Sequence, residues 1–403
     1  MKKIVALVET VSAKKPGHYK AFMCFFTESL LNLGYRVVVL MPDKALIEDW
    51  VDEHCSDQLN NFYAYDFYPK QKSYKSWGRF NDVFNKLSAW KNVRSQLKQT
   101  EKKSSHKIDL VFFNMLDSFI TNYLHPLLLN RVFSYQWSGL YFHPWHLRTH
   151  KKSLKAVPSI SDIDIVLTSK NCQAVTIHDE GILQSFQKRL LNKKVILFPE
   201  IADGTSPNPQ LAVVQKIKSA AKGRTIIGMI GLAPYKGLLT LIQIAKKINP
   251  QEFFLVFAGK WSEKPNQGYT IKQHQEASNF FNELPEHCFK YLQFINEGAD
   301  FNALFCSIDI PFLVYNNFAS SSNNLTKAAI FKKLVIASKG FCIGDDVENY
   351  NLGITVNQGN VDQCIKAIHH LKNKNHQLQP RFEEYTNIHS NRVLNDKFLE
   401  MLN

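Results

Sequence analysis

Short runs of continuous apolar residues recur along the chain, and a longer helical pattern follows most of them. Continuous apolar character, in contrast to strict alternation, is typical of parallel strands that are covered on both faces. The recurrence therefore predicts an α/β fold with a doubly wound parallel sheet. In the first half the predicted strands are 4–8, 37–41, 110–113, 132–135, 163–167 and 195–198, and the predicted helices are 19–33, 76–99 and 180–191.

A proline-rich segment over 199–209 divides the chain into two halves of similar length, as a linker between domains would. Beyond it the same rhythm begins again, which predicts two Rossmann-like domains, 1–203 and 204–379. Ligands of doubly wound sheets bind beyond the carboxyl ends of the strands, so we expect the site in a cleft between the domains. In the second half the predicted strands are 225–230, 253–258, 308–314, 334–337 and 354–356, and the predicted helices are 235–248, 324–332 and 361–371.

The composition excludes several classes of protein. Hydrophobic residues make up 45% of the 403 residues, which is too many for a disordered chain. No apolar run approaches the roughly 18–20 residues that span a bilayer, and Glu9 ends the N-terminal run too early for a signal peptide. The 7 cysteines occur singly, which favours reduced thiols and a cytoplasmic location.

The formal net charge of +14 is concentrated in the segment 70–107, which also carries an amphipathic helical pattern. One interpretation is a helix that lies on anionic lipid, giving peripheral association with the inner face of a membrane through 75–107. The other is a helix whose apolar face packs on its own sheet. Nucleic acid would suit the charge too, but no recognition motif accompanies it, so no nucleic-acid partner is predicted. The apolar face comprises Trp77, Phe80, Phe84, Leu87 and Trp90.

Two loops between a predicted strand and the next helix carry residues suited to a ligand. The first contains Gly17, which lets the backbone approach a ligand closely, and His18, a residue able to act as a general base. The second places Gly231 at a strand end and Lys236 at a helix entrance, where a lysine can meet a phosphate. The alternative for both loops is an ordinary solvated turn.

A third loop, before the predicted helix 324–332, contains more consecutive small polar residues than one helix cap needs. Their hydroxyls and the N–H groups of the helix start are suited to a phosphate, and Lys327 would add a cation one turn later. The alternative is a well-capped helix. The predicted phosphate-binding residues are Ser320, Ser321, Ser322, Asn323, Asn324 and Lys327.

These motifs resemble those of the GT-B glycosyltransferases, in particular the group 1, family 4-like enzymes that use nucleotide sugars. The segment 231–237 resembles the family's strand-end glycine followed by Lys-Gly. The segment 325–338, reading LTKAAIFKKLVIAS, resembles its helix-strand unit LLEAMACGLPVVAS. The resemblance covers nearly the whole chain but indicates a divergent branch, because Ala319 and Lys327 stand where retaining members often carry paired glutamates.

The resemblance implies a glycosyltransferase that moves a sugar from a nucleotide-diphosphate sugar to a glycan or lipid-linked acceptor, as in polysaccharide biosynthesis. No metal or other cofactor is implied, since cations and N–H groups can stabilise the departing diphosphate. The first domain would bind the acceptor, and a C-terminal helix over 380–403 would pack back on it. The second domain would bind the donor. The predicted donor-binding residues are Gly17, Gly231, Lys236, Ser320, Ser321, Ser322, Asn323, Asn324 and Lys327.

An aromatic segment, 135–146, follows the predicted strand 132–135 at a place where the resemblance implies a ligand-facing loop. Aromatic faces suit stacking on sugars, so this loop is predicted to bind the acceptor. No carboxylate accompanies the histidines of the loop, so no metal site is predicted there. The predicted acceptor-binding residues are Trp137, Ser138, Gly139 and Tyr141.

His18 and His143 are the predicted catalytic residues, and Asp117 and Ser118, at another strand end, are secondary candidates. In an inverting reaction His18 would be the base, whereas a retaining reaction demands no protein base. Two rival functions remain open. One is a nucleotide-sugar epimerase or hydrolase, and the other is a non-catalytic nucleotide-sugar-binding protein, which the absence of both glutamates motivates.

Overall fold

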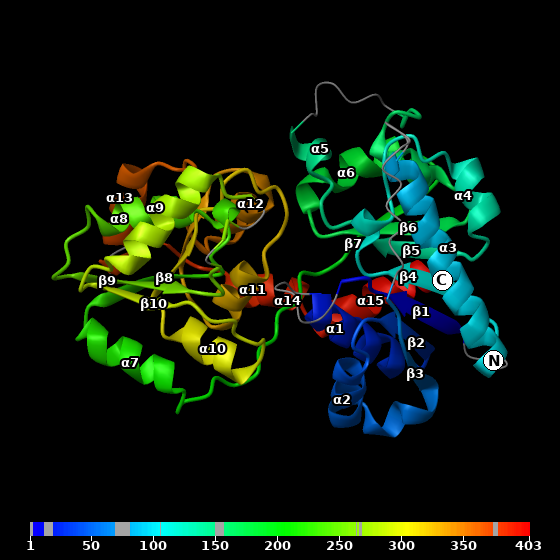
Figure 1. The fold of residues 1–403 in the computed structure, drawn as a ribbon, viewed down its shortest axis with the longest axis horizontal. Helices are drawn as coiled ribbons and strands as arrows, with labels where there is room; N and C mark the ends of the chain where they lie inside the picture. Colours follow the sequence, from blue (N-terminus) through cyan, green and yellow to red (C-terminus); the bar gives the residue numbers. More distant parts are fainter. Residues whose placement is uncertain are drawn as a thin grey trace. The chain divides into compact units, whose positions relative to one another are not determined.

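The structure, a computed structural model of the chain, describes residues 3–11, 19–68, 81–104, 106–149, 157–262, 264–265, 268–373 and 378–403. The chain divides into two compact units, Met1–Ile201 with Ser390–Asn403, and Ala202–His389. Each unit is built on one parallel sheet that helices flank (Figure 1). This confirms the predicted α/β class with two Rossmann-like, doubly wound domains.

The first unit contains a sheet in the order β3-β2-β1-β4-β5-β6-β7, in which every neighbouring pair is parallel. The order reverses between β1 and β4, which makes the carboxyl ends of these two strands the topological switch point. The strands are β1 (Ile4–Val8), β2 (Arg36–Met41), β3 (Phe62–Asp66), β4 (Leu110–Phe113), β5 (Trp137–Leu140), β6 (Cys172–Ile177) and β7 (Lys194–Leu197).

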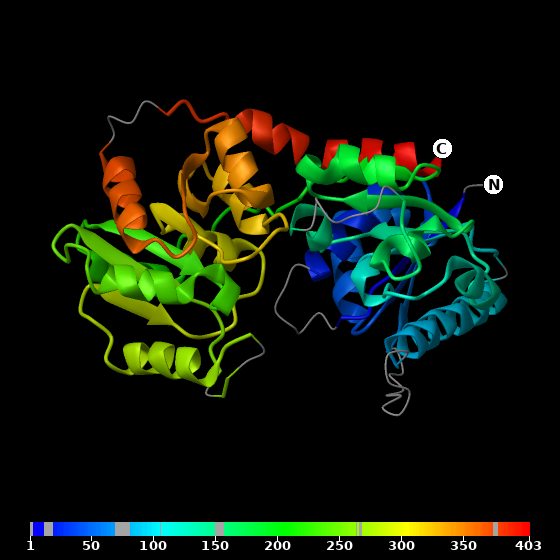
Figure 2. The ribbon, with the colours of Figure 1, turned by 90° about the horizontal axis from the view of Figure 1, so that it is seen from above.

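Two apolar layers cover the two faces of this sheet. One contains Ala6, Val111 and residues of α3, and the other contains Leu7, Phe112 and residues of α1 and α15. Successive side chains of a strand point to opposite faces, so a strand that is apolar throughout needs both layers. Figure 2 shows α3 and α15 on opposite sides of the sheet. The helices of the unit are α1 (Tyr19–Asn32), α2 (Ala45–His54), α3 (Asn81–Ser104), α4 (Pro126–Val132), α5 (Trp145–Thr149), α6 (Glu180–Arg189) and α15 (Asn391–Leu402).

Two predicted strands of the first unit are wrong. The segment 132–135 contains the end of α4 and the turn after it, and the strand is Trp137–Leu140. The segment 163–167 falls in a 3-10 helix, η4 (Ile163–Thr168), and the next strand is Cys172–Ile177. The apolar pattern did not predict β5 because this strand contains Ser138 and Gly139. A β-carbon at Gly139 would lie 2.9 Å from the carbonyl oxygen of Phe113 on β4, so packing requires glycine in this strand.

The amphipathic helix α3 also differs from the predicted lipid-facing helix. Leu87 and Trp90 of α3 are buried in the core, and the Trp90 indole donates to the carbonyl oxygen of Phe119 at 3.0 Å. Leu87 and Trp90 therefore pack on the helix's own sheet and are not available to lipid. Phe84 of the same predicted face is 36% exposed, and Trp77 and Phe80 lie outside the described residues. No described helix is long and apolar enough to cross a membrane.

The second unit contains a parallel sheet in the order β10-β9-β8-β11-β12-β13, with its switch point between β8 and β11. Helices α8, α9 and α13 cover one face, and α7, α10, α11, α12 and α14 cover the other. The strands are β8 (Thr225–Ile230), β9 (Phe253–Ala258), β10 (Cys288–Tyr291), β11 (Ile310–Leu313), β12 (Val335–Ser338) and β13 (Gly353–Val356). The helices are α7 (Ala212–Ala221), α8 (Leu238–Ala245), α9 (Ile271–Asn282), α10 (Ala299–Cys306), α11 (Asn323–Ile330), α12 (Phe341–Tyr350), α13 (Val361–Lys372) and α14 (Phe382–Ile388).

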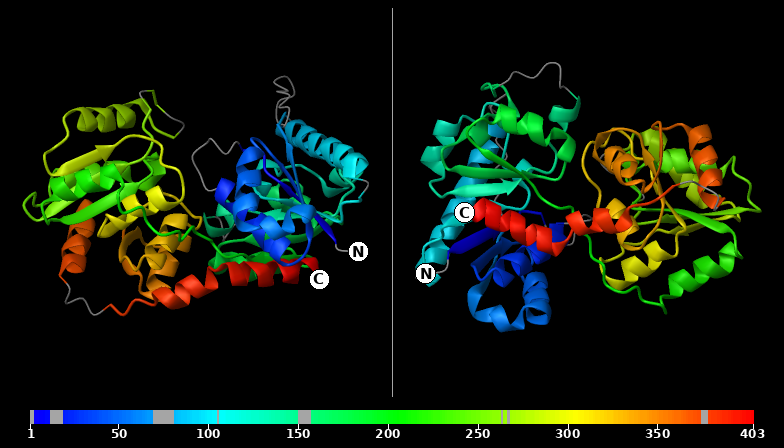
Figure 3. Two further views of the ribbon diagram at one scale, coloured as in Figure 1. Left: turned by 90° about the horizontal axis from the view of Figure 1, so that it is seen from below. Right: turned by 180° about the vertical axis from the view of Figure 1, so that it is seen from behind.

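The C-terminal segment consists of two helices where one returning helix over 380–403 was predicted. Tyr385 of α14 is buried in the core of the second unit. Leu394 and Phe398 of α15 are buried in the core of the first unit, where both chain termini lie (Figure 3). Only the second helix therefore belongs to the first unit.

Candidate functional site

The switch point of the second unit brings Lys236 over the end of β8. Gly231 ends this strand with φ +92°, a left-handed conformation that glycine adopts without strain. A β-carbon there would lie 2.6 Å from Lys236 Nζ, so glycine also leaves room for the lysine. Lys236 Nζ donates to the carbonyl oxygen of Ile230 at 3.1 Å and lies 5.6 Å from the centre of the Tyr315 ring. The half-buried ammonium is thus fixed at the carboxyl edge of the sheet.

Asn324 and Ser322, at the start of α11, meet the same groups. Asn324 Nδ2 donates to the carbonyl oxygen of Ile230 at 3.2 Å and to the Tyr315 hydroxyl at 3.3 Å. The Ser322 hydroxyl lies 3.4 Å from that of Tyr315. Burial raises the pKa of Tyr315 to about 12, so its phenol stays neutral near pH 7. The structure therefore gathers three of the predicted donor-binding residues, Lys236, Ser322 and Asn324, around one strand end.

The other small polar residues of this loop lie next to that group in sequence. Ser320, Ser321 and Asn323 are buried, and Ser322 is the N-cap residue of α11. The Ser322 side chain makes no capping hydrogen bond, so capping does not account for its hydroxyl. An anion at this end of α11 would meet the positive end of the helix dipole.

Lys327 does not join the group, which corrects its predicted role. It is fully buried, and Nζ donates to Asn302 Oδ1 at 2.7 Å and to the carbonyl oxygen of Asp203 at 2.9 Å. A carboxylate oxygen of Glu297 lies 3.0 Å away and completes an ion pair, although 28% of the glutamate side chain is exposed. The charge of Lys327 is thus used inside the second unit, tying α11 to α10 and to the start of the unit.

Tyr315 and the ring pair beside it were not predicted from the sequence. The Tyr235 and Phe318 rings stack with centroids 5.1 Å apart and an interplanar angle of 10°, and Phe318 also contacts Tyr315 edge-on. Tyr235 is exposed. The signal was present, since an aromatic residue precedes both Lys236 and the small polar residues.

At the switch point of the first unit, Glu9 lies buried at the end of β1. Glu9 Oε1 accepts hydrogen bonds from the backbone N–H groups of Thr10 at 2.6 Å and Val11 at 2.7 Å. Oε2 accepts one from Asn114 Nδ2, beyond β4, at 2.5 Å. Desolvation raises the pKa of Glu9 to about 7 despite these hydrogen bonds. This carboxyl was not predicted as part of a site.

The structure pairs His143, a predicted catalytic residue, with Asp117, a secondary candidate. Asp117 Oδ1 lies 3.2 Å from His143 Nδ1 and accepts the backbone N–H of His143 at 2.8 Å. Oδ2 accepts the backbone N–H of Phe142, also at 2.8 Å. The side chain of His143 is 34% exposed, so the second ring nitrogen is left to a ligand. The dyad has the geometry of a histidine base oriented by a carboxylate.

Lys86 fixes the segment that carries Asp117. Its ammonium, largely buried on α3, donates to the carbonyl oxygens of Ser118 at 2.8 Å and Asp117 at 3.4 Å. Burial lowers the pKa of Lys86. The other predicted catalytic residue, His18, and its neighbour Gly17 lie outside the described residues.

The four predicted acceptor-binding residues are not in a ligand-facing loop, which is a correction. Trp137, Ser138 and Gly139 form β5, and the Trp137 ring packs on Trp90 at 5.1 Å inside the core. Tyr141, just beyond the strand, is 1% exposed, and burial holds its pKa well above the usual value. A sugar would have to open the core to stack on these rings. The exposed ring in this region is Trp145, which contacts His143 edge-on at 5.3 Å.

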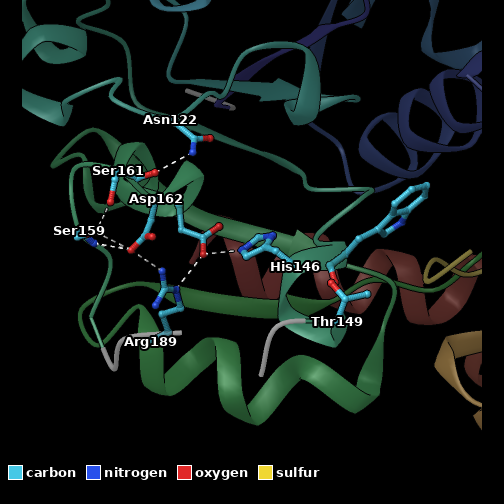
Figure 4. Close-up of polar contacts among 9 residues, drawn as sticks. Asn122, His146, Thr149, Ser159, Ser161, Asp162 and Arg189 are labelled. Atoms are coloured by element: carbon cyan, nitrogen blue, oxygen red, sulfur yellow. Dashed lines mark hydrogen bonds and ion pairs between the residues drawn. The ribbon is translucent and has the colours of Figure 1, made fainter. Parts of the chain in front are cut away.

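A polar network holds the segment 159–164, which leads into η4 (Figure 4). Arg189 on α6 donates through Nε to Asp164 Oδ2 and through Nη2 to Asp162 Oδ2, both at 2.9 Å. His146 Nε2 lies 2.9 Å from the same oxygen of Asp164, which is fully buried. The contact with the buried Asp164 Oδ2, which Arg189 also meets, gives His146 a structural role. Among the described residues, no group of three or more His, Cys, Asp and Glu side chains is arranged to hold a metal ion.

No known family profile and no curated protein matches this sequence. Solved structures do match over almost its full length. Alr3699/HepE of Anabaena in complex with UDP-glucose has a TM-score of 0.67 at 15% identity, covering 99% of each chain. Sucrose-phosphate synthase of Thermosynechococcus elongatus has a TM-score of 0.68 at 12% identity, covering 100% of this chain and 98% of that one. WaaG, a glycosyltransferase involved in lipopolysaccharide biosynthesis, has a TM-score of 0.61 at 11% identity, with 98% of each chain covered.

These proteins are GT-B glycosyltransferases, and the chain described here has their fold. The fold-level resemblance found in the motifs is therefore confirmed. At such identities the match shows the fold alone, and the chemistry depends on the residues of the site.

Proposed function

We propose that the protein is a glycosyltransferase that moves a sugar from a nucleotide-diphosphate sugar to a glycan or lipid-linked acceptor without a metal ion. The observation that carries the proposal is the group at the β8–β11 switch point, where Lys236, Ser322 and Asn324 meet at one strand end. Doubly wound sheets bind nucleotides at this place. The crystallised complexes of HepE with UDP and with UDP-glucose support the same ligand class.

The second unit would bind the donor. When the bond to the sugar breaks, negative charge develops on the leaving diphosphate, and a fixed cation stabilises that charge without reorganisation. Lys236 supplies the cation, and the start of α11 supplies hydroxyls and a helix dipole of the right sign. Ala319 and Lys327 cannot accept a ribose hydroxyl proton. Tyr315 and Asn324 are buried and hydrogen-bonded to each other, so a more exposed group such as the Ser322 hydroxyl would have to orient the nucleoside.

The first unit would bind the acceptor. In an inverting reaction His143 would accept the proton of the attacking hydroxyl, and Asp117 would stabilise the resulting imidazolium. In a retaining reaction the same dyad would only position the acceptor. Trp145, exposed beside His143, offers a ring on which a sugar can stack. On sequence grounds we retain His18 as a catalytic residue and Gly17 as a donor-binding residue.

The proposal is tested by the thermal stability of the protein with uridine, guanosine, cytidine and adenosine diphosphates and their sugars. One nucleotide at 100 times its Kd should add about 2.7 kcal/mol to the unfolding free energy. Lys236→Met should lose this gain, while Lys246→Met, at an exposed position on the same unit, should keep it. If no nucleotide stabilises the protein, the glycosyltransferase proposal is refuted.

A non-catalytic nucleotide-sugar-binding protein is the second candidate, because both glutamate positions have lost their carboxylates. It predicts nucleotide stabilisation without diphosphate release under any pairing of donor and acceptor. An epimerase or hydrolase predicts donor turnover without an acceptor. If the enzyme inverts, His143→Gln should lower kcat about 100-fold, and His54→Gln, on an outer helix, should not.

Three further proposals come from the sequence. They are a cytoplasmic location, peripheral association with the inner face of a membrane, and a role in polysaccharide biosynthesis. WaaG, which is involved in lipopolysaccharide biosynthesis, supports the last at the level of fold. The charge of the basic segment 75–107 supports the membrane association. Its apolar residues Leu87 and Trp90 lie in the core and do not contribute to that support.

A further inference from the structure

Exposed apolar side chains gather on two neighbouring segments of the first unit. One segment leads into α4 and includes its first turn, and the other precedes η4. Every member is at least 40% exposed, and Leu127 reaches 66%. We call this set the α4 surface, and its residues are Tyr123, Leu127, Leu128, Val157 and Ile160.

Hydrogen bonds join the two segments into one surface. The backbone N–H of Tyr123 donates to the carbonyl oxygen of Ile160 at 2.9 Å. Asn122 Nδ2 donates to the carbonyl oxygen of Ser161 at 2.7 Å (Figure 4). Asp162, held by Arg189, anchors the second segment through the Ser159 N–H at 2.7 Å. The apolar side chains are therefore displayed by a fixed backbone.

Tyr123 is displayed against its backbone preference. Its φ of +64° lies in the left-handed region, which a bulky aromatic residue rarely adopts. Such strain persists where the surroundings determine it and often marks a functional segment. Tyrosine is also the residue type that suits a boundary between water and hydrocarbon, because it combines a ring with a polar tip.

Cations flank the α4 surface. Arg131 lies four residues after Leu127 and so shares its face of the helix. Arg94 of α3 donates to the carbonyl oxygen of Val132 at the end of α4, at 3.1 Å, with the exposed Lys91 and Lys98 one turn to either side. On the opposite flank, Ser169, next to the exposed Lys170, donates to Asn130 of α4 at 2.5 Å.

The carboxylates of these segments are already engaged. Glu101 accepts the Tyr135 hydroxyl at 2.7 Å and the Ile108 N–H at 2.9 Å. Asp162 and the buried Asp164 both accept from Arg189. An apolar centre with a cationic border is complementary to the headgroups and acyl chains of an anionic bilayer.

We propose that the first unit docks on anionic lipid through the α4 surface, with Leu127, Leu128 and Ile160 entering the headgroup region. This deepens the proposed membrane association and places it on α4 and not on the apolar face of α3. It requires no glycosyl transfer, so its failure would leave the nucleotide test of the second unit unaffected.

The test is co-sedimentation of the full chain with vesicles of phosphatidylcholine, alone or mixed in equal parts with phosphatidylglycerol. We expect binding to the mixed vesicles only. Leu127→Ser with Leu128→Ser should lower the partition coefficient at least tenfold. Leu59→Ser with Ile271→Ser, a matched loss of two exposed apolar side chains elsewhere, should leave it unchanged. Lys98→Gln with Arg131→Gln should weaken binding, whereas Lys216→Gln with Lys246→Gln should not.

Two outcomes would overturn the inference. One is equal binding by the Leu127/Leu128 double variant and the protein with the native sequence. The other is a concentration-dependent dimer, seen by sedimentation velocity, that the double variant abolishes while vesicle binding persists, because the surface would then join two copies of the chain. Circular dichroism of each variant shows whether it is folded, so a loss of binding can be assigned to the surface.

Discussion

Lys327 offers the sharpest test of the structure, because two lines of reasoning give it opposite roles. The sequence motif predicts that it binds the nucleotide, whereas the structure buries its ammonium among three oxygen atoms. Lys327→Met keeps the aliphatic stem and removes only the ammonium. The substitution therefore isolates the polar contacts from the packing.

The magnitude follows from the contacts that are lost. Hydrogen bonds that involve a charged group contribute about 1.5–3 kcal/mol each, and Lys327 donates two. Asn302 is fully buried, so its Oδ1 would lose its donor and could not be hydrated by solvent. The lysine's own desolvation penalty disappears, which places the net loss near 3 kcal/mol. A domain of this size loses about 2–4 °C per kcal/mol, so the melting temperature of the second unit should fall by about 6–12 °C.

The assay is differential scanning calorimetry with and without the stabilising nucleotide. Lys327→Met should melt early yet keep its nucleotide-induced shift. Lys327→Glu should be worse still, since the new carboxylate would face Glu297 and Asp203. Lys332→Met, two residues beyond the end of α11 in an exposed pair with Glu383, should change stability by less than about 0.5 kcal/mol. A Lys327→Met protein with an unchanged melting temperature and no nucleotide shift would refute the structural role.

Two further predictions concern the first unit. Because burial raises the pKa of Glu9 from 4.5 to about 7, the folded state favours its protonated form. Its contribution to stability should be complete below pH 4.5 and fall by about 3 kcal/mol as the pH rises towards 7, and urea unfolding of Glu9→Gln should lack this dependence. Trp90→Ala should cost about 3–5 kcal/mol in urea unfolding, against little for Phe84→Ala on the exposed side of α3. A stable Trp90→Ala protein with weakened vesicle binding would restore the lipid-facing interpretation of this helix.

The parts of the fold that the sequence predicted well are those that local composition determines. β1 and β9 are continuous apolar runs, and their ends agree with the predicted ranges. β5 was misplaced because its residues are selected by contact with the neighbouring strand β4. Gly139 must be small where the Phe113 backbone passes, and small residues weaken the apolar signal of a strand. The strands β3 and β10 were not predicted. Both lie at sheet edges, where burial is incomplete and the apolar run is short.

The same distinction separates the site residues. Lys236 and Asn324 were predicted because a strand end and the helix start after it place them, and both signals lie within a few residues. Trp137 was misassigned because an aromatic residue in an apparent loop and one in a central strand look alike in sequence. Asp117 and His143 lie beyond different strands, so only the register of β4 against β5 brings them together.

The replacement of both family glutamates has the character of a rebuilt site. A decaying site would leave partners of the lost groups unsatisfied, whereas the lysine at 327 meets Asn302, Glu297 and the Asp203 carbonyl at hydrogen-bonding distance. Its cation is balanced locally, so α11 brings no uncompensated lysine to the nucleotide and its positive dipole end remains. In the proposed donor site, Lys236 would then be the cation that meets the diphosphate. Recognition of the nucleoside would no longer use a charged carboxylate, and a neutral group such as the Ser322 hydroxyl stabilises a hydroxyl less strongly. Such a site would bind its nucleotide mainly through the diphosphate.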